Sequence, residues 1–411
     1  MGQYDRLYRL YETVDAETVR AYQELVDLFP PLGSTVGLNQ WESARAELDE
    51  RKAAITEEFP EPYAELAAHL TREEAFTALD LYAKYARTVN VLVLDVDETL
   101  RSAGDTDNEI PRPTLHLLTE FHERGIPIVI CTGQTLENVK GFMIQGLGND
   151  VVASGALSVV YETGNAVFTP DHGADTKRLL YEELDPVIVE TFDGVRGRVL
   201  SEAPDGVRRG CHLQGNEFNV TIKPNAEVGS DTAVEIIDDA VRYFCGLVGQ
   251  ALADAVDVDV ADPALLARTY FARDPEIAAV FDDGGLAFDG DLDAAPAVFS
   301  DALTQLDVGY YKGDAVELVS LELDKPTGVR EAMDVLAVDE PFALAMGDSK
   351  SDLRVMEWLD ESDSGIAAAP EHASQHVIDH VTATDRLVFG RGDAAEMLRT
   401  AFALTQFATL D

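Results

Sequence analysis

Two carboxylates spaced two residues apart are the first groups in this chain that could do chemistry. Asp95 and Asp97 belong to the segment DVDETL, which directly follows a continuous apolar run at 91–94. Residues two apart on an extended segment point to the same side. Two acids on one side of a strand end can share a metal ion or divide the roles of nucleophile and acid–base catalyst. Because an apolar strand leads directly into them, the pattern favours a functional site over a solvated acidic loop.

Three further sets of polar residues follow apolar or loop segments later in the chain. Thr132 and Gly133 come after the next apolar run, where a hydroxyl followed by glycine can donate to a phosphate oxygen, although such a turn is common. Lys325 stands out because few of the basic residues are lysines, but a single lysine is as often a solvated loop residue. Asp348 ends another apolar run, and Asp352 lies in the first turn of the following helix, a position that suits acids.

The elements expected to position these residues alternate between strands and helices. Apolar runs at 90–95 and 126–131 flank a helical pattern at 113–124, which predicts a βαβ unit in a parallel sheet. The same alternation of strand and helix patterns is found again after residue 340, with a strand predicted at 342–346 and a helix at 351–359. Ligands bind at the carboxyl ends of strands in such α/β sheets, so the polar residues above are expected to meet there.

The chain is expected to divide into four segments. Residues 1–88 read as helices only, and 89–155 as the first part of the parallel-sheet domain. An inserted α+β domain is expected at 156–317, and 318–411 completes the parallel-sheet domain. The N-terminal helices form either an accessory or oligomerisation layer or a wrap packed on the next domain, and the second interpretation is favoured.

The charge balance is strongly acidic. The 411 residues include 76 acids and 31 lysines and arginines, which gives a net charge of −45, and the acids are spread along the chain. This composition resembles that of cytoplasmic proteins of salt-in halophiles, where molar salt screens the self-repulsion, although an acidic mesophilic protein has the same signature. Nucleic acids and anionic membranes require positive surfaces, so neither is an expected partner.

Composition also bounds the class of protein. Apolar residues make up 46% of the chain, as in ordinary globular proteins, and no apolar run approaches the ~18–20 residues of a membrane span. The first residues show no signal peptide, and the three cysteines form neither a zinc pattern nor a disulfide framework. We therefore expect a cytoplasmic globular protein of about two or three domains; the sequence does not predict its oligomeric state.

Taken in order, the polar motifs resemble those of the haloacid dehalogenase (HAD) superfamily. The resemblance covers roughly 90–155 and 318–411. An insert between the second and third motifs is similar to the family's C2-type cap, and Ala153–Ala156 is similar to the stretch that leads into that cap in subclass IIB sugar-phosphate phosphatases. The matching residues are Asp95, Asp97, Thr99, Thr132, Gly133, Lys325, Gly347, Asp348 and Asp352. Two positions depart from the family pattern: Glu98 replaces a frequent glycine, and Ser351 replaces a common asparagine.

The resemblance implies a Rossmann-like core and a Mg²⁺-dependent phosphatase. Asp95 would attack phosphorus to form an aspartyl phosphate, and Asp97 would protonate the leaving oxygen and then activate water. Mg²⁺ would be held by Asp95, the carbonyl of Asp97 and Asp348, with Asp352 orienting Lys325 or the metal's waters. Phosphoryl oxygens would be bound by Thr132, Gly133 and Lys325. The implied substrate is a small phosphorylated metabolite of the sugar-phosphate class.

Several alternatives stay open. Arg208, Arg209, His212 and Lys223 form a basic cluster in the insert that either contacts substrate or pairs with local acids. A phosphomutase would use the same aspartyl phosphate and return it to substrate. A non-catalytic binding protein on the same fold is the third candidate, which the presence of both Asp95 and Asp97 disfavours.

Overall fold

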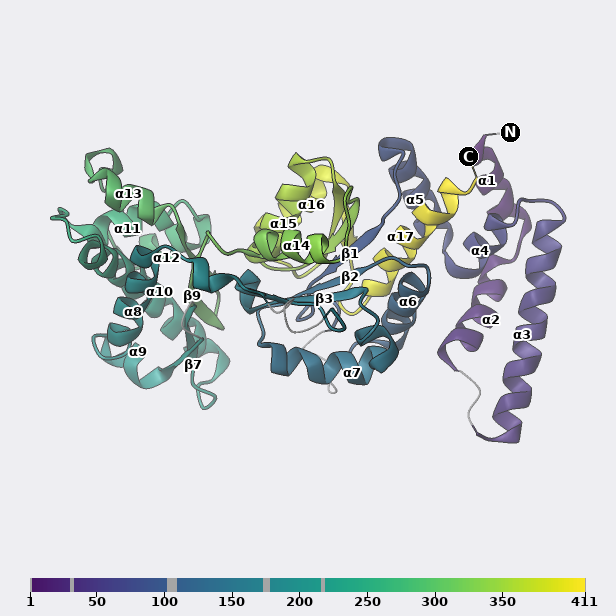
Figure 1. Cartoon of the computed structure of the whole chain (residues 1–411), viewed down its shortest axis with the longest axis horizontal. Helices are drawn as coiled ribbons and strands as arrows, with labels where there is room; N and C mark the ends of the chain where they lie inside the picture. The colour runs from purple at the N-terminus through teal and green to yellow at the C-terminus, as the bar shows by residue number, and fades with distance from the viewer. Residues whose placement is uncertain (1, 30–32, 102–108, 173–177, 216–218, 411) are drawn as a thin grey trace. The chain divides into compact units, whose positions relative to one another are not determined.

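The computed structural model of the chain describes residues 2–29, 33–101, 109–172, 178–215 and 219–410 (Figure 1). The chain divides into two compact units. Unit 1 comprises Met1–Arg178 and Gly328–Asp411, and unit 2 comprises Leu179–Thr327. Each unit is described by itself below.

Unit 1 is built on a mainly parallel sheet, as the sequence predicts for an α/β protein. Neighbouring strands from β12 to β3 run parallel, and β3 pairs antiparallel with β4. The central strands VLVL, IVIC and ALAM are buried at every position, as expected for strands covered on both faces. In sheet order the strands are β12 (Leu387–Phe389), β11 (Gly365–Pro370), β10 (Ala343–Met346), β1 (Val91–Leu94), β2 (Ile128–Cys131), β3 (Leu157–Tyr161), β4 (Ala166–Phe168) and β5 (Arg178–Leu179).

Helices cover both faces of this sheet. In Figure 1, α15 and α16 lie on one side of the sheet and α6 and α7 on the other. Helix α15 contacts β10 and β11, whereas α7 contacts β3. The helices of this layer are α6 (Arg112–Glu123), α7 (Leu136–Val152), α14 (Lys325–Val335), α15 (Lys350–Glu361), α16 (Gln375–Thr384) and α17 (Ala394–Ala408).

The N-terminal helices share one apolar core with the last helix of the chain. Leu7, Leu10, Tyr63 and Leu66 are fully buried in a cluster that also contains Phe407 of α17. Burying such side chains contributes about 1.5–3 kcal/mol each, so this core is a main source of local stability. The helices are α1 (Gln3–Thr13), α2 (Ala16–Leu28), α3 (Thr35–Thr56), α4 (Pro62–His69) and α5 (Arg72–Tyr85).

Unit 2 is an α+β unit in which helices pack on an antiparallel sheet. Its four strands pair in the antiparallel order β6 (Cys211–Gln214), β7 (Val220–Pro224), β9 (Ala315–Ser320), β8 (Leu306–Tyr311). Helices α8 and α10 pack on one face, where alternate apolar residues of β7 and β9 are buried. The helices are α8 (Pro186–Arg198), α9 (Asp205–Gly210), α10 (Ser230–Ala255), α11 (Pro263–Phe271), α12 (Pro275–Asp283) and α13 (Ala297–Leu303).

The boundaries of unit 2 differ from the 156–317 expected for the insert. Residues 157–161 form β3, which pairs with β2 in the sheet of unit 1. All five residues of β3 are buried, so the strand belongs to the main core and the second unit starts only at Leu179. Residues 173–177 and 216–218 of the expected insert lie outside the described residues.

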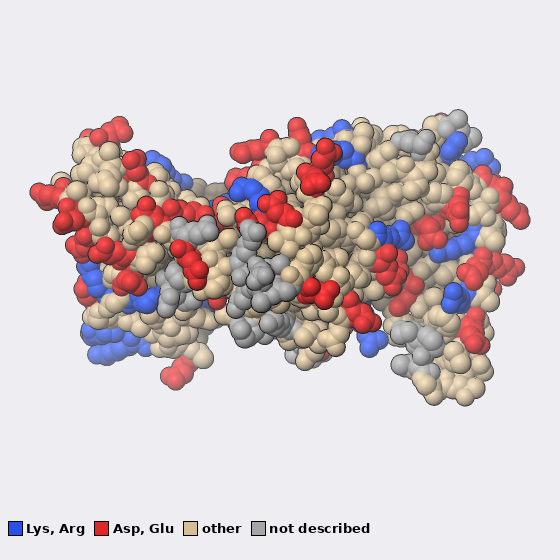
Figure 2. All heavy atoms as spheres, in the orientation of Figure 1, with Lys and Arg blue, Asp and Glu red and all other residues tan. Residues whose placement is uncertain are grey.

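The surface carries the acidity seen in the sequence. Acidic side chains are spread over the visible face, and basic side chains are fewer (Figure 2). Among the described helices, none combines the length and apolar character needed to cross a membrane.

A half-buried ion pair joins the N-terminal helices to the sheet layer. His116 Nε2 of α6 lies 3.0 Å from Asp27 Oδ2 of α2. Burial lowers the pKa of His116, but the hydrogen bond and charge of Asp27 outweigh it and leave the pKa raised. Burial raises the pKa of Asp27, but hydrogen bonds from His116 and Gln23 outweigh that effect and leave it lowered.

We expect Asp27→Asn to lower the free energy of unfolding by about 1 kcal/mol near pH 5.5 and by much less near pH 9. The raised pKa of His116 contributes stability that is present below its unfolded value and lost as pH rises through the folded value. The lowered pKa of Asp27 contributes stability that is lost as pH falls. Urea unfolding at both pH values measures the difference, with the exposed Glu12→Gln as a charge-matched control. An equal loss at both pH values would contradict the ion-pair account.

Candidate active site

Three carboxylates meet where β1 and β10 end. Asp95 follows β1, Asp348 follows β10 after one glycine, and Asp352 lies in the first turn of α15. The two strands pair in parallel, and Asp95 N donates to Met346 O at 2.9 Å. One carboxylate oxygen from each of the three lies within 4.8 Å of the others. The structure therefore brings together three of the four residues that the sequence predicts for the metal site.

Helix capping fixes Asp352 within this cluster. Ser349 donates to Asp352 Oδ2 from its backbone N at 3.1 Å and from its hydroxyl at 2.6 Å, and the Ser351 hydroxyl lies 2.9 Å from that of Ser349. A Cβ added at Gly347 would lie 2.3 Å from Asp352 Cβ, so only glycine permits this approach. The glycine and the cap together hold one carboxylate oxygen toward Asp95.

Burial makes this cluster a strong ligand set for a cation. Asp95 is 6% exposed and Asp352 is 4% exposed, and Asp348 is half-buried. Like charges this close repel strongly away from water, and a divalent cation offsets that repulsion. Carboxylate oxygens are the donors that Mg²⁺ prefers, so the residues present fit this ion.

The Asp97 carboxylate lies outside the cluster and is held by two donors. Arg101 donates to Oδ1 from Nε at 3.1 Å and from Nη2 at 2.8 Å. Gln134 Nε2 donates to Oδ2 at 2.5 Å. The side chain of Asp97 is 45% exposed, so it is fixed in orientation while still reaching solvent. The sequence analysis did not identify Arg101 or Gln134 as partners of Asp97. The only signal in the sequence is that Arg101 closely follows Asp97 and Gln134 closely follows Thr132.

Glu98 has a backbone conformation that favours glycine. Its φ is +58°, in the left-handed region that disfavours residues with a Cβ. The carboxylate lies 3.3 Å from His372 Nε2, after β11, and 3.4 Å from Arg391 Nη1, after β12. The contact with Arg391 is an ion pair, and both contacts link the loop that carries Asp97 to two neighbouring strand ends.

The Thr132–Gly133 loop is fixed by its backbone. Thr132 N donates to Val160 O at 2.9 Å, and Thr132 O accepts from Thr163 N at 3.2 Å. The Thr132 hydroxyl accepts from Gln134 N at 3.1 Å, so its own proton remains to be donated. Thr132 is buried and Gly133 is exposed, which is the arrangement that a phosphate-binding turn needs.

Lys325 is the first residue of α14 and is 2% exposed. The helix starts with a cap in which Asp324 Oδ1 accepts from Thr327 N at 2.9 Å and from the Thr327 hydroxyl at 2.8 Å. In its next turn, a Cβ at Gly328 would lie 2.4 Å from Val160 Cγ1, so the helix packs closely on the end of β3. A role for Lys325 at phosphoryl oxygens stays a prediction.

A half-buried carboxyl group in unit 2 was not foreseen from the sequence. Burial raises the pKa of Glu317 in β9, while hydrogen bonds from Asn219 and Thr221 and the charges of Lys223 and Lys325 act against this. Thr221 lies directly opposite Glu317 in the sheet. The polar face of this sheet therefore carries a cross-strand hydrogen-bonded group.

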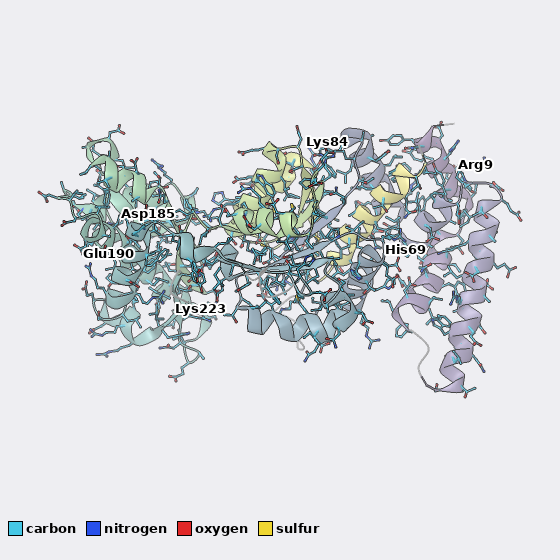
Figure 3. The ribbon with its side chains drawn as sticks, in the orientation of Figure 1. Arg9, His69, Lys84, Asp185, Glu190 and Lys223 are labelled. Atoms are coloured by element: carbon cyan, nitrogen blue, oxygen red, sulfur yellow. The ribbon has the colours of Figure 1, made fainter. Side chains whose placement is uncertain are left out.

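The basic cluster expected in the insert separates into two pairs. Arg208 and Arg209 lie on α9 and pair with Asp205. His212 of β6 is opposite Lys223 of β7 in the register of the two strands. Lys223 is labelled in Figure 3. Each has a local partner: Lys223 Nζ lies 3.3 Å from Asp314 Oδ2, and His212 Nδ1 lies 3.3 Å from Asn225 Oδ1. Substrate contact by these four residues stays a prediction.

We expect Mg²⁺ to raise the melting temperature of the wild type and not of Asp348→Asn. A ligand that binds the folded state at 100 times its Kd stabilises it by about 2.7 kcal/mol. Without Mg²⁺, Asp348→Asn is expected to be at least as stable as the wild type, because one like charge is removed. Calorimetry in molar KCl with and without millimolar MgCl₂ tests this, with the exposed Asp339→Asn as control. A Mg²⁺ shift that persists in Asp348→Asn would exclude the cluster as the site.

Part of the chain that carries these residues is similar in sequence to a known family. A family model described as haloacid dehalogenase-like hydrolase matches residues 92–184. No curated protein matches the chain in sequence. Among solved structures, a HAD phosphatase of Bacteroides thetaiotaomicron is 16% identical (78% of this chain, 96% of that chain, TM-score 0.44). Trehalose-6-phosphate phosphatase of Aspergillus fumigatus is 13% identical (79% and 97%, TM-score 0.39). The segment that matches the model of the haloacid dehalogenase-like hydrolases carries Asp95, Asp97, Thr132 and Gly133, in agreement with the resemblance seen in the motifs.

Proposed function

We propose that the protein is a Mg²⁺-dependent phosphomonoesterase that acts on a small phosphorylated metabolite, of the sugar-phosphate class, through an aspartyl phosphate. The observation that carries this proposal is the cluster of Asp95, Asp348 and Asp352, which lies at a strand end beside a loop bearing a second acid, Asp97. A lone cation site would not need Asp97 on that loop, whereas a two-step phosphoryl transfer needs both a nucleophile and an acid–base group.

In the first step a carboxylate oxygen of Asp95 attacks phosphorus, and the bond from phosphorus to the ester oxygen breaks. Asp97 gives its proton to that departing oxygen. In the second step Asp97 takes a proton from water as the water oxygen bonds to phosphorus. The bond between phosphorus and Asp95 then breaks, which releases phosphate and restores both side chains.

The charge of the substrate requires local compensation in so acidic a chain. Mg²⁺ at Asp95, the carbonyl of Asp97 and Asp348, with Asp352 beside it, would supply positive charge at the phosphoryl group. Thr132 donates its hydroxyl proton to a phosphoryl oxygen, and Lys325 adds the positive charge that a dianion needs. The exposed backbone at Gly133 lets a phosphate approach the loop without steric hindrance.

The substrate class follows from the proposed role of unit 2. We assign Leu179–Thr327 as a C2-type cap. This unit follows the second motif and ends two residues after Lys325, the residue of the third motif. A bulky cap that closes over a site suits a small soluble ester better than a phosphoprotein, because closure excludes water from the reaction. The acidic composition further suggests that the enzyme works in the cytoplasm of a salt-accumulating cell, so assays belong in molar KCl.

We expect Asp95→Asn to reduce phosphate release by at least about a thousandfold, because removing a nucleophile abolishes the covalent route. The measurement is inorganic phosphate release from a panel of sugar phosphates with Mg²⁺ in molar KCl. Asp339→Asn serves as an exposed control, and circular dichroism confirms that each variant is folded. A folded wild type that releases no phosphate from any ester would contradict the proposal. A requirement for a bisphosphate would instead indicate a phosphomutase.

A further inference from the structure

Gln134 is fixed through both of its main-chain groups. Its N–H donates to the Thr132 hydroxyl at 3.1 Å, and its carbonyl accepts from Glu162 N at 3.0 Å. A residue held on both sides along the backbone can place its side chain with little conformational freedom left to lose. The backbone of Gln134 is therefore held in place, as a positioning residue requires.

The turn that holds Gln134 adopts an unfavourable backbone conformation. Glu162, Thr163 and Gly164 all have positive φ, at +52°, +60° and +102°. A left-handed conformation costs a residue with a Cβ about 1–2 kcal/mol, and such conformations persist where the surrounding structure enforces them. Here Thr163 N donates to Thr132 O at 3.2 Å, and Asn165 Nδ2 donates to Glu162 O at 2.6 Å. The backbone amides of Glu162 and Thr163 thus both donate hydrogen bonds to the loop from Thr132 to Gln134.

The side chain of Gln134 binds the acid–base group of the proposed reaction. Its Nε2 donates to Asp97 Oδ2 at 2.5 Å, while Arg101 donates to Oδ1 at 2.8 Å. Each carboxylate oxygen therefore has its own donor, and the plane of the carboxylate is set by two contacts from different loops. The chain of contacts runs from the turn at 162–164 through Gln134 to Asp97.

We propose that Gln134 is a positioning residue that holds Asp97 for proton transfer, an inference that rests on the proposed phosphatase function. A side-chain amide has both a donor and an acceptor. It can therefore donate to the Asp97 carboxylate and, after rotation of its amide plane, accept from the carboxylic acid. This suits a group that gives up a proton in the first step and takes one in the second. A leucine of similar size offers neither interaction.

The two chemical steps differ in their need for Asp97, and this difference provides the test. With p-nitrophenyl phosphate the departing phenolate needs no proton, so only hydrolysis of the aspartyl phosphate depends on Asp97. With an alkyl sugar phosphate both steps depend on it. We expect Gln134→Leu to leave the burst rate of p-nitrophenolate within about twofold of wild type. Its steady-state turnover of both esters should fall about ten- to a hundredfold. With p-nitrophenyl phosphate the KM should fall together with kcat, because the first step is unchanged and kcat/KM therefore stays at the wild-type value.

Two further variants separate positioning from loss of structure. Gln134→Asn keeps the amide on a shorter side chain and is expected to retain part of the lost turnover. Gln23→Leu is the matched control, because Gln23 Nε2 also donates to a carboxylate, Asp27 Oδ2, at 2.6 Å in the N-terminal helices. It is expected to leave both the burst and the steady-state rates unchanged.

Three outcomes would overturn the inference. Steady-state turnover of the sugar phosphate by Gln134→Leu at the wild-type rate would show that Asp97 does not need Gln134. An equal fall of burst and steady-state rates would show a general structural defect. A wild type that turns over neither ester would overturn the proposed function itself. This outcome is distinguished from a failure of the Gln134 inference because it is seen without any substitution.

Discussion

Repulsion between carboxylates at one edge of the sheet is the constraint on which the rest of the site depends. Parallel pairing of β1 with β10 places Asp95 and Asp348 side by side, and the cap of α15 adds Asp352. Two unit charges about 4 Å apart repel by about 4 kcal/mol at an effective dielectric constant near 20. Strand pairing and apolar burial on both faces of the sheet must offset this repulsion, since the pairing of β1 with β10 fixes the backbone that carries Asp95 and Asp348.

Around this edge the backbone is strained at several places that all bear on the site. Glu98 follows the first acidic pair, and the turn from Glu162 to Gly164 supports the Thr132 loop. Strained backbone persists where neighbouring contacts enforce it, and functional sites are where such strain collects. An ion pair with Arg391 and a contact with His372 hold Glu98, and main-chain hydrogen bonds hold the turn. Contacts within the loops thus orient the acidic side chains, whereas the pairing of the strands determines approximately where these residues lie.

That division explains what the sequence could predict. Apolar runs and the residues directly after them predicted the sheet and the meeting of Asp95 with Asp348, because strand ends follow from burial and parallel pairing. Arg101 and Gln134 were missed because their contacts with Asp97 depend on loop conformations that no periodicity encodes. The start of the second unit was misplaced because LSVVY at 157–161 is apolar whether it forms a strand of the main sheet or of an insert. The pairing of the N-terminal helices with α17 is equally invisible to local patterns.

The shared core of the first and last helices has a consequence for how the chain is made. Phe407 and Ala403 complete the cluster formed by the helices before residue 85, and Arg399 Nε lies 2.7 Å from Glu74 Oε1. A ribosome adds about 5–20 residues per second, so these helices wait on the order of tens of seconds for their last partner to emerge. During that interval the surfaces of α4 and α5 that later contact α17 stay exposed. Acidic residues on the opposite faces would then keep nascent chains apart, which gives the high negative charge a role during synthesis as well as in the finished protein.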